Sequence, residues 1–128
     1  MFQLNNSFLR KTLVVYTLLI LLLAVLPLNS TSLILNNTYV ISIRLDYLVH
    51  FAVYIPWMFL VWVAYKVNFR SNFKKAFLWI LIGLLFACVS EGIQYFLTYR
   101  SFNINDMLGN SIGVVLGSAF FAFPTRKG

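Results

Sequence analysis

Three acidic residues and one histidine are the side chains in this sequence whose types suit acid–base chemistry. The acids are Asp46, Glu91 and Asp106, and His50 follows Asp46 by four positions. Residues four apart share a face of a helix, so the Asp46 carboxylate could orient the imidazole and raise its basicity. An equally weighted interpretation is a helix N-cap at Asp46 with a hydrogen-bonded polar tip at His50.

Glu91 gives the strongest functional indication because it lies well inside an apolar stretch. A carboxylate at the centre of a membrane helix costs about 2.5–3.5 kcal/mol, and less towards the helix end. We therefore expect Glu91 to pair with Arg100 or His50, or to be protonated. Our hypothesis is that Glu91, His50 and Asp46 are acid–base residues, and a structural ion pair at Glu91 is the alternative.

Other polar residues extend this set towards a ligand. We predict Arg100, Gln94, Asp106 and Asn110 as ligand-binding residues, with Arg100 holding an anionic headgroup or phosphate. The structural alternatives are an Arg100–Asp106 salt bridge and interhelical hydrogen bonds from Gln94 and Asn110. We predict no metal and no other cofactor, because the sequence has no HExxH, no CxxC and no Gly-rich phosphate loop.

The composition indicates the environment of these residues. The chain is 61% hydrophobic and 10% charged, with a mean hydropathy of +0.84, whereas soluble domains are about 45–50% apolar and about 25% charged. We therefore expect an integral membrane protein in which residues 1–128 form a single domain. The net charge of +7 comes from basic residues in short loops between apolar segments, which favours anionic lipid over nucleic acid as a partner.

Four segments are long and apolar enough to be helices that cross a membrane, which needs about 20 residues. They cover about residues 11–27, 46–66, 76–97 and 106–123. We therefore predict an all-α bundle of four transmembrane helices. The longest connection, residues 28–45, is expected to lie in the membrane interface or to cover the outer end of the bundle.

The basic residues predict the orientation of this bundle. Eight of the ten fall on one side in this topology, and only Arg44 and Arg100 fall on the other. The eight are Arg10, Lys11, Lys66, Arg70, Lys74, Lys75, Arg126 and Lys127. The positive-inside rule then places both termini in the cytoplasm.

The topology also brings the rare polar groups to one level. With a rise of about 1.5 Å per residue, His50, Glu91 and Asn110 lie roughly 6–9 Å below the outer ends of their helices. On the last segment, Gly109, Gly113 and Gly117 recur every four residues, a spacing that lets helix backbones approach closely in lipid. Because Asn110 shares their stripe, we expect the polar groups to face protein.

These motifs together resemble those of the VanZ-like membrane protein family. The matching residues are Asp46-x-x-x-His50-Phe51, Glu91-x-x-Gln94, Arg100-x5-Asp106 and Asp106-x3-Asn110-x2-Gly113-x3-Gly117, and the likeness extends over about residues 44–118. The family commonly has a lysine directly after the first Asp, where this chain has Tyr47. The resemblance implies a small helical bundle in a bacterial envelope, and the founding member is associated with low-level teicoplanin resistance.

The expected function is binding or modifying an amphiphilic envelope component, such as a lipid headgroup or a lipid-linked precursor. The expected location is the bacterial cytoplasmic membrane, and whether a reaction occurs stays open. The alternative is a small structural subunit of a larger membrane complex, with a membrane protein or a second copy as partner. A channel or ion-coupled transporter is less favoured, because the inner half of the bundle has almost no polar lining.

Overall fold

The computed structural model describes residues 5–27, 34–35, 37–68 and 71–122. Four helices lie lengthwise in one bundle: α1 (Asn6–Val25), α3 (Leu45–Tyr65), α4 (Phe73–Tyr95) and α5 (Ile104–Ala122). A short hairpin of β1 (Tyr39–Val40) and β2 (Ile43–Arg44) precedes α3. The prediction of an all-helical bundle is confirmed, with this hairpin as an addition.

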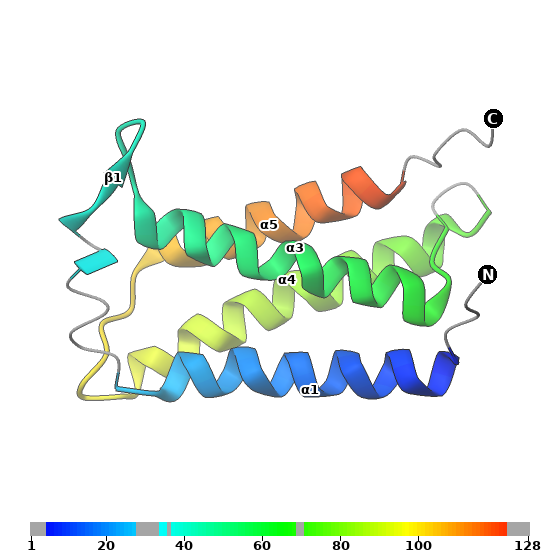
Figure 1. Ribbon diagram of the computed structural model, residues 1–128, viewed down its shortest axis with the longest axis horizontal. Coiled ribbons are helices and arrows are strands. Elements are labelled where there is room, and N and C mark those ends of the chain that lie inside the picture. Colours follow the sequence, from blue (N-terminus) through cyan, green and yellow to red (C-terminus); the bar gives the residue numbers. More distant parts are fainter. Residues whose placement is uncertain (1–4, 28–33, 36, 69–70, 123–128) are drawn as a thin grey trace.

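The two ends of the bundle differ in what they carry. The hairpin, the α4–α5 connection and the end of α1 lie at one end, which we call the hairpin end (Figure 1). The start of α1, the α3–α4 connection and the end of α5 lie at the other end (Figure 1). Consequently α3 and α5 run parallel to each other, and α1 and α4 run in the opposite direction.

The helices begin earlier than the hydropathy predicted. The first was expected from residue 11 but begins at Asn6, with the Asn5 side chain accepting a hydrogen bond from Ser7 N at 3.0 Å. The third was expected from residue 76 but begins at Phe73, with Asn72 accepting from Lys75 N at 3.0 Å. Asparagine caps satisfy backbone N–H groups at a helix start, so these polar first turns are helical although they are not apolar.

Three of the described helices, α1, α3 and α4, are long and apolar enough to cross a membrane. The fourth, α5, is not among them because its first two turns carry Asn105, Asp106 and Asn110. Asp106 and Asn110 are nevertheless only 8% and 1% exposed. Asp106 and Asn110 therefore face the neighbours of α5 in the bundle, whereas Asn105 is exposed.

The hairpin occupies residues 39–44 of the 28–45 connection, and residues 34–35 and 37 before it are helical. Residues 28–33 and 36 lie outside the described residues. Tyr39 pairs with Arg44 and Val40 with Ile43. Its turn residues, Ile41 and Ser42, have φ angles of 51° and 65°, the pattern of a type I′ turn. The turn reverses the chain directly before α3 and brings Arg44 next to the first turn of that helix.

The closest helix contact joins α5 to α3 through the glycine stripe. A Cβ on Gly109 would lie 3.2 Å from the Tyr47 carbonyl oxygen, and one on Gly117 would lie 3.2 Å from Met58 Cβ. A Cβ on Gly113 would overlap the carbonyl oxygen of Phe51. Small residues at an interface allow such close approach, and the contact sets the register of the two helices.

Much of the apolar core of the bundle lies between α3, α4 and α5. Tyr54, Trp57 and Val61 from α3 pack with Ala87 of α4 and Val114 of α5, and all five are at most 3% exposed.

Side-chain hydrogen bonds attach α1 to the middle of α3. The Tyr16 hydroxyl donates to Val53 O at 2.9 Å, and Trp57 Nε1 donates to Thr17 Oγ1 at 2.9 Å.

Candidate functional site

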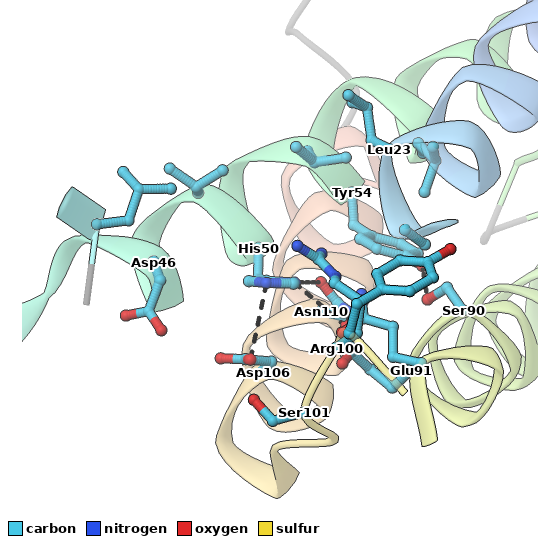
Figure 2. A pocket seen from close by; sticks show the side chains of 17 residues that line it. Leu23, Asp46, His50, Tyr54, Ser90, Glu91, Arg100, Ser101, Asp106 and Asn110 are labelled. Atoms are coloured by element: carbon cyan, nitrogen blue, oxygen red, sulfur yellow. Dashed lines mark hydrogen bonds and ion pairs between the residues drawn. The ribbon is translucent and has the colours of Figure 1, made fainter. Parts of the chain in front are cut away.

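A cavity of about 330 Å³ lies at the hairpin end of the bundle. Its size is near the lower limit of small-molecule sites, which span about 300–1,000 Å³. Figure 2 shows polar side chains from α3, α4, α5 and the α4–α5 connection around one space. Much of the remaining lining is apolar and comes from α1 and α3: Ile20, Leu23, Ala24, Val49 and Val53.

Asn110 of α5 connects the polar groups of three helices. Its Nδ2 donates to Glu91 Oε1 at 2.9 Å, and its Oδ1 lies 3.1 Å from His50 Nδ1. His50 Nδ1 is also 3.3 Å from Glu91 Oε1. An amide oxygen and a carboxylate only accept hydrogen bonds, so Nδ1 carries a hydrogen in this arrangement. The three residues that the sequence placed at one depth are therefore in direct contact.

The second ring nitrogen of His50 faces the start of α5. Its Nε2 lies 3.9 Å from Asp106 Oδ2, which is an ion-pair distance when the ring is protonated but too long for a hydrogen bond. Asn103 Nδ2 donates to Asp106 Oδ1 at 3.4 Å. The imidazole thus lies between two carboxylates, and its side chain is 25% exposed. Such a ring can take up or release a proton at Nε2.

Glu91 is almost fully enclosed, at 1% exposure. Its Oε1 is bonded to Asn110, but its Oε2 has no hydrogen-bond partner among the described residues. Buried polar atoms are nearly always hydrogen bonded, because an unmade bond costs about 1–3 kcal/mol. An unpartnered carboxylate oxygen in the wall of a cavity is typical of a site that is completed by another molecule.

The predicted pair of Asp46 with His50 is not formed, and an acid–base role of Asp46 stays a prediction. Its carboxylate accepts from Arg44 Nη2 at 2.6 Å and from Arg44 Nε at 3.1 Å. The N-cap interpretation is also wrong, because α3 begins at Leu45 and Asp46 lies in its first turn. Desolvation lowers the pKa of Arg44, but the charge of Asp46, the hydrogen bond to it and the nearby Tyr47 and Asp106 together raise the pKa, and the net shift is upward. The hairpin thus supplies the partner of Asp46.

Arg100 lies in the α4–α5 connection and lines the cavity. No described carboxylate lies within 4.0 Å of its guanidinium, so neither the Arg100–Asp106 nor the Arg100–Glu91 pair is formed. Gln94, at 4% exposure, lines the same cavity. All four predicted ligand-binding residues therefore border one space. Within the described residues, no group of His, Cys, Asp and Glu has the geometry to hold a metal ion.

A model of the VanZ/LLP1 family matches residues 3–124. The chain belongs to the VanZ/LLP1 family. No curated protein and no solved structure matches it. The suspected resemblance is confirmed, and the match extends beyond the predicted residues 44–118 to include α1. Family membership supports assignment of the chain to the membrane of the cell envelope.

Tyr47 stands where VanZ-like proteins commonly have lysine. Its side chain connects the first turn of α3 to the hairpin and to the start of α5. Its hydroxyl accepts from Arg44 Nη1 at 3.0 Å and from Asn105 Nδ2 at 3.3 Å. The Arg44 guanidinium also lies over the ring, 4.6 Å from its centroid. A positive charge is thus present beside this position, but it belongs to Arg44 on the hairpin.

Tyr54 and Ser90 also line the cavity of this VanZ/LLP1 chain, but the sequence analysis did not predict them as site residues. The Tyr54 hydroxyl lies 2.8 Å from Ser90 Oγ, which donates to Ala87 O at 2.9 Å. Both line the cavity. Their positions in the sequence could have indicated them, because Tyr54 lies one helical turn after His50 and Ser90 directly precedes Glu91.

Proposed function

We propose that this VanZ/LLP1 protein binds an amphiphilic component of the bacterial envelope, such as a phospholipid or a lipid-linked precursor, with its headgroup in the cavity. The two kinds of lining support this. The polar side presents His50, Glu91 and Arg100, and the α1 side presents aliphatic residues. A ligand with a charged and an apolar part matches both surfaces.

The proposed setting is the cytoplasmic membrane with four spans and both termini in the cytoplasm. Described basic residues support this orientation, because Arg10, Lys11, Lys66, Lys74 and Lys75 lie at the end opposite the hairpin. As the fourth span, α5 would keep Asp106 and Asn110 away from lipid through its contact with α3. The cavity would then open near the outer headgroup level.

The observation that carries the proposal is Arg100, a cation beside a cavity with no carboxylate within 4.0 Å among the described residues. A guanidinium offers five N–H donors in a fork that matches phosphate or carboxylate oxygens. We assign it to the anionic group of the headgroup. If chemistry follows binding, His50 Nε2 would exchange a proton with the ligand, and Glu91 would stabilise the charged ring from the Nδ1 side.

The test is lipid binding by the purified full chain in mild detergent. Native mass spectrometry would compare the wild type with Arg100→Gln and with Lys11→Gln, an exposed cation at the opposite end. A hydrogen bond to a charged group is worth about 1.5–3 kcal/mol, so Arg100→Gln should weaken binding of anionic amphiphiles by roughly 10–100-fold. Lys11→Gln should bind as the wild type does. Equal binding by all three proteins would refute the role of Arg100.

The same purification addresses the alternative of an accessory subunit. A stoichiometric protein partner, in place of retained lipid, would favour that role. A link to glycopeptide resistance is part of the proposal on the ground of family membership alone. It would be tested by deleting the protein and by complementing with Arg100→Gln, measuring teicoplanin susceptibility.

A further inference from the structure

The proposed function assigns only one charge of the cavity, the Arg100 guanidinium. The opposite side of the polar lining carries the carboxylates of Glu91 and Asp106, which share a single imidazole. A protonated His50 can balance only one negative charge, so when both carboxylates are ionised one of the two charges has no cation of its own in contact. The same cavity therefore presents an unpaired cation on the α4–α5 connection and an excess negative charge at the start of α5.

Asp106 is the more accessible of the two carboxylates, with a side chain that is 12% exposed. Its contacts among the described residues are long: 3.4 Å to Asn103 Nδ2 and 3.9 Å to His50 Nε2. Ionised carboxylates accept short hydrogen bonds of about 2.7–2.9 Å from charged nitrogen donors. Asp106 thus retains acceptor capacity that a donor in the cavity would fill.

Glu91 adds an independent indication of a missing donor. It is 1% exposed, it lines the cavity, and its Oε2 has no partner among the described residues. A buried carboxylate without its full set of donors is destabilised. A cationic group in the cavity would offset the negative charge that Glu91 and Asp106 share across His50.

We infer that the headgroup is zwitterionic, with an anionic phosphate or carboxylate on Arg100 and a primary ammonium directed at Asp106. This rests on the proposed function and names the chemistry of its ligand. An ammonium supplies both the charge and the N–H donors that Asp106 lacks, whereas a purely anionic headgroup would meet two carboxylates. One molecule would then pair with both the Arg100 guanidinium and the Asp106 carboxylate.

The experiment titrates the purified full chain with short-chain phosphatidylethanolamine, which has an ammonium and a phosphate, and with phosphatidylglycerol, which has the phosphate alone. We expect the first to bind about tenfold more tightly, since one charge-assisted hydrogen bond is worth about that factor. Asp106→Asn should bring the ratio to about one by weakening phosphatidylethanolamine only. Arg100→Gln should weaken both lipids together.

Each outcome separates this inference from the proposed function. Phosphatidylglycerol binding as tightly as phosphatidylethanolamine in the wild type, with loss of both in Arg100→Gln, overturns the zwitterion and leaves the amphiphile site. Binding of neither lipid overturns both. Soluble phosphoethanolamine binding as tightly as the lipid upholds the ammonium–anion chemistry and overturns the lipid as its source. If Asp106→Asn fails to fold, the ratio of the wild-type affinities for phosphatidylethanolamine and phosphatidylglycerol still tests the zwitterionic headgroup.

Discussion

Gly113→Ala is expected to separate α5 from α3 and to destabilise the protein. The added Cβ would overlap the Phe51 carbonyl oxygen and would lie 3.1 Å from Tyr54 Cβ. Because the first contact is with backbone, no rotamer change can relieve it. A gap of about 0.5–1 Å forfeits a quarter to a half of each dispersion contact across the seam, and overpacking costs about 1–3 kcal/mol.

Gly92→Ala is the matched control, because a Cβ on Gly92 of α4 would have nothing within 4 Å. There the substitution only removes the cost of glycine in a helix, so it should stabilise by about 0.5–1 kcal/mol. Gly109→Ala and Gly117→Ala should fall between, since their nearest contacts are 3.2 Å. The expected order of stability is Gly92→Ala, wild type, the two intermediate variants, and Gly113→Ala.

The assay is equilibrium unfolding in mixed micelles, followed by circular dichroism and by fluorescence of the three tryptophans, Trp57, Trp62 and Trp79. Helix content at zero denaturant should be the same in all variants, so that a shift in the midpoint reports packing. A Gly113→Ala protein that gains as much stability as Gly92→Ala would refute the backbone contact between α3 and α5.

Three further predictions concern the polar groups of the cavity. Asn110→Ala removes the donor to Glu91 and the contact with His50, and should cost about 1.5–3 kcal/mol by the same unfolding measurement. Asn110→Asp should cost more than Asn110→Ala at neutral pH, because it places a second carboxylate against Glu91; an equal cost would argue against an ionised Glu91. Tyr54→Phe removes the bond to Ser90 and should cost about 0.5–1 kcal/mol, and a double-mutant cycle with Ser90→Ala should give a coupling energy of that size.

The sequence predicted the polar cluster well because helical rise relates position to depth. His50, Glu91 and Asn110 were placed at one level from the rise per residue, and they are in hydrogen-bond or ion-pair contact. The pattern of every fourth residue likewise placed Gly113 on the face that meets α3. Both inferences rest on the regular rise and repeat of an α-helix, and the helices of the structure follow that geometry.

The partner of Asp46 could not be predicted, because it depends on a loop. Arg44 reaches Asp46 from a hairpin whose turn, Ile41-Ser42, has none of the Asn or Gly residues that indicate a type I′ turn. The alternative of an Arg100–Asp106 salt bridge is wrong, because the α4–α5 connection places the Arg100 guanidinium more than 4.0 Å from every described carboxylate. Helical spacing does not predict the contacts of Arg44 and Arg100, because Arg44 lies in the hairpin and Arg100 lies in the α4–α5 connection.

The backbone contact at Gly113 has a consequence for how the bundle can move. At Gly113 the α5 backbone meets the Phe51 carbonyl group of α3 directly, so we expect α3 and α5 to move together. In contrast, α1 is held through side chains: Leu13 and Ile20 pack in the apolar core, and hydrogen bonds join the helix at Tyr16, Thr17 and Val25. We therefore expect that α1 moves relative to the other helices on the microsecond to millisecond scale of helix motions. If the proposed ligand is a lipid, its tail would reach the cavity from the bilayer by displacing α1 against both its apolar packing and its hydrogen bonds.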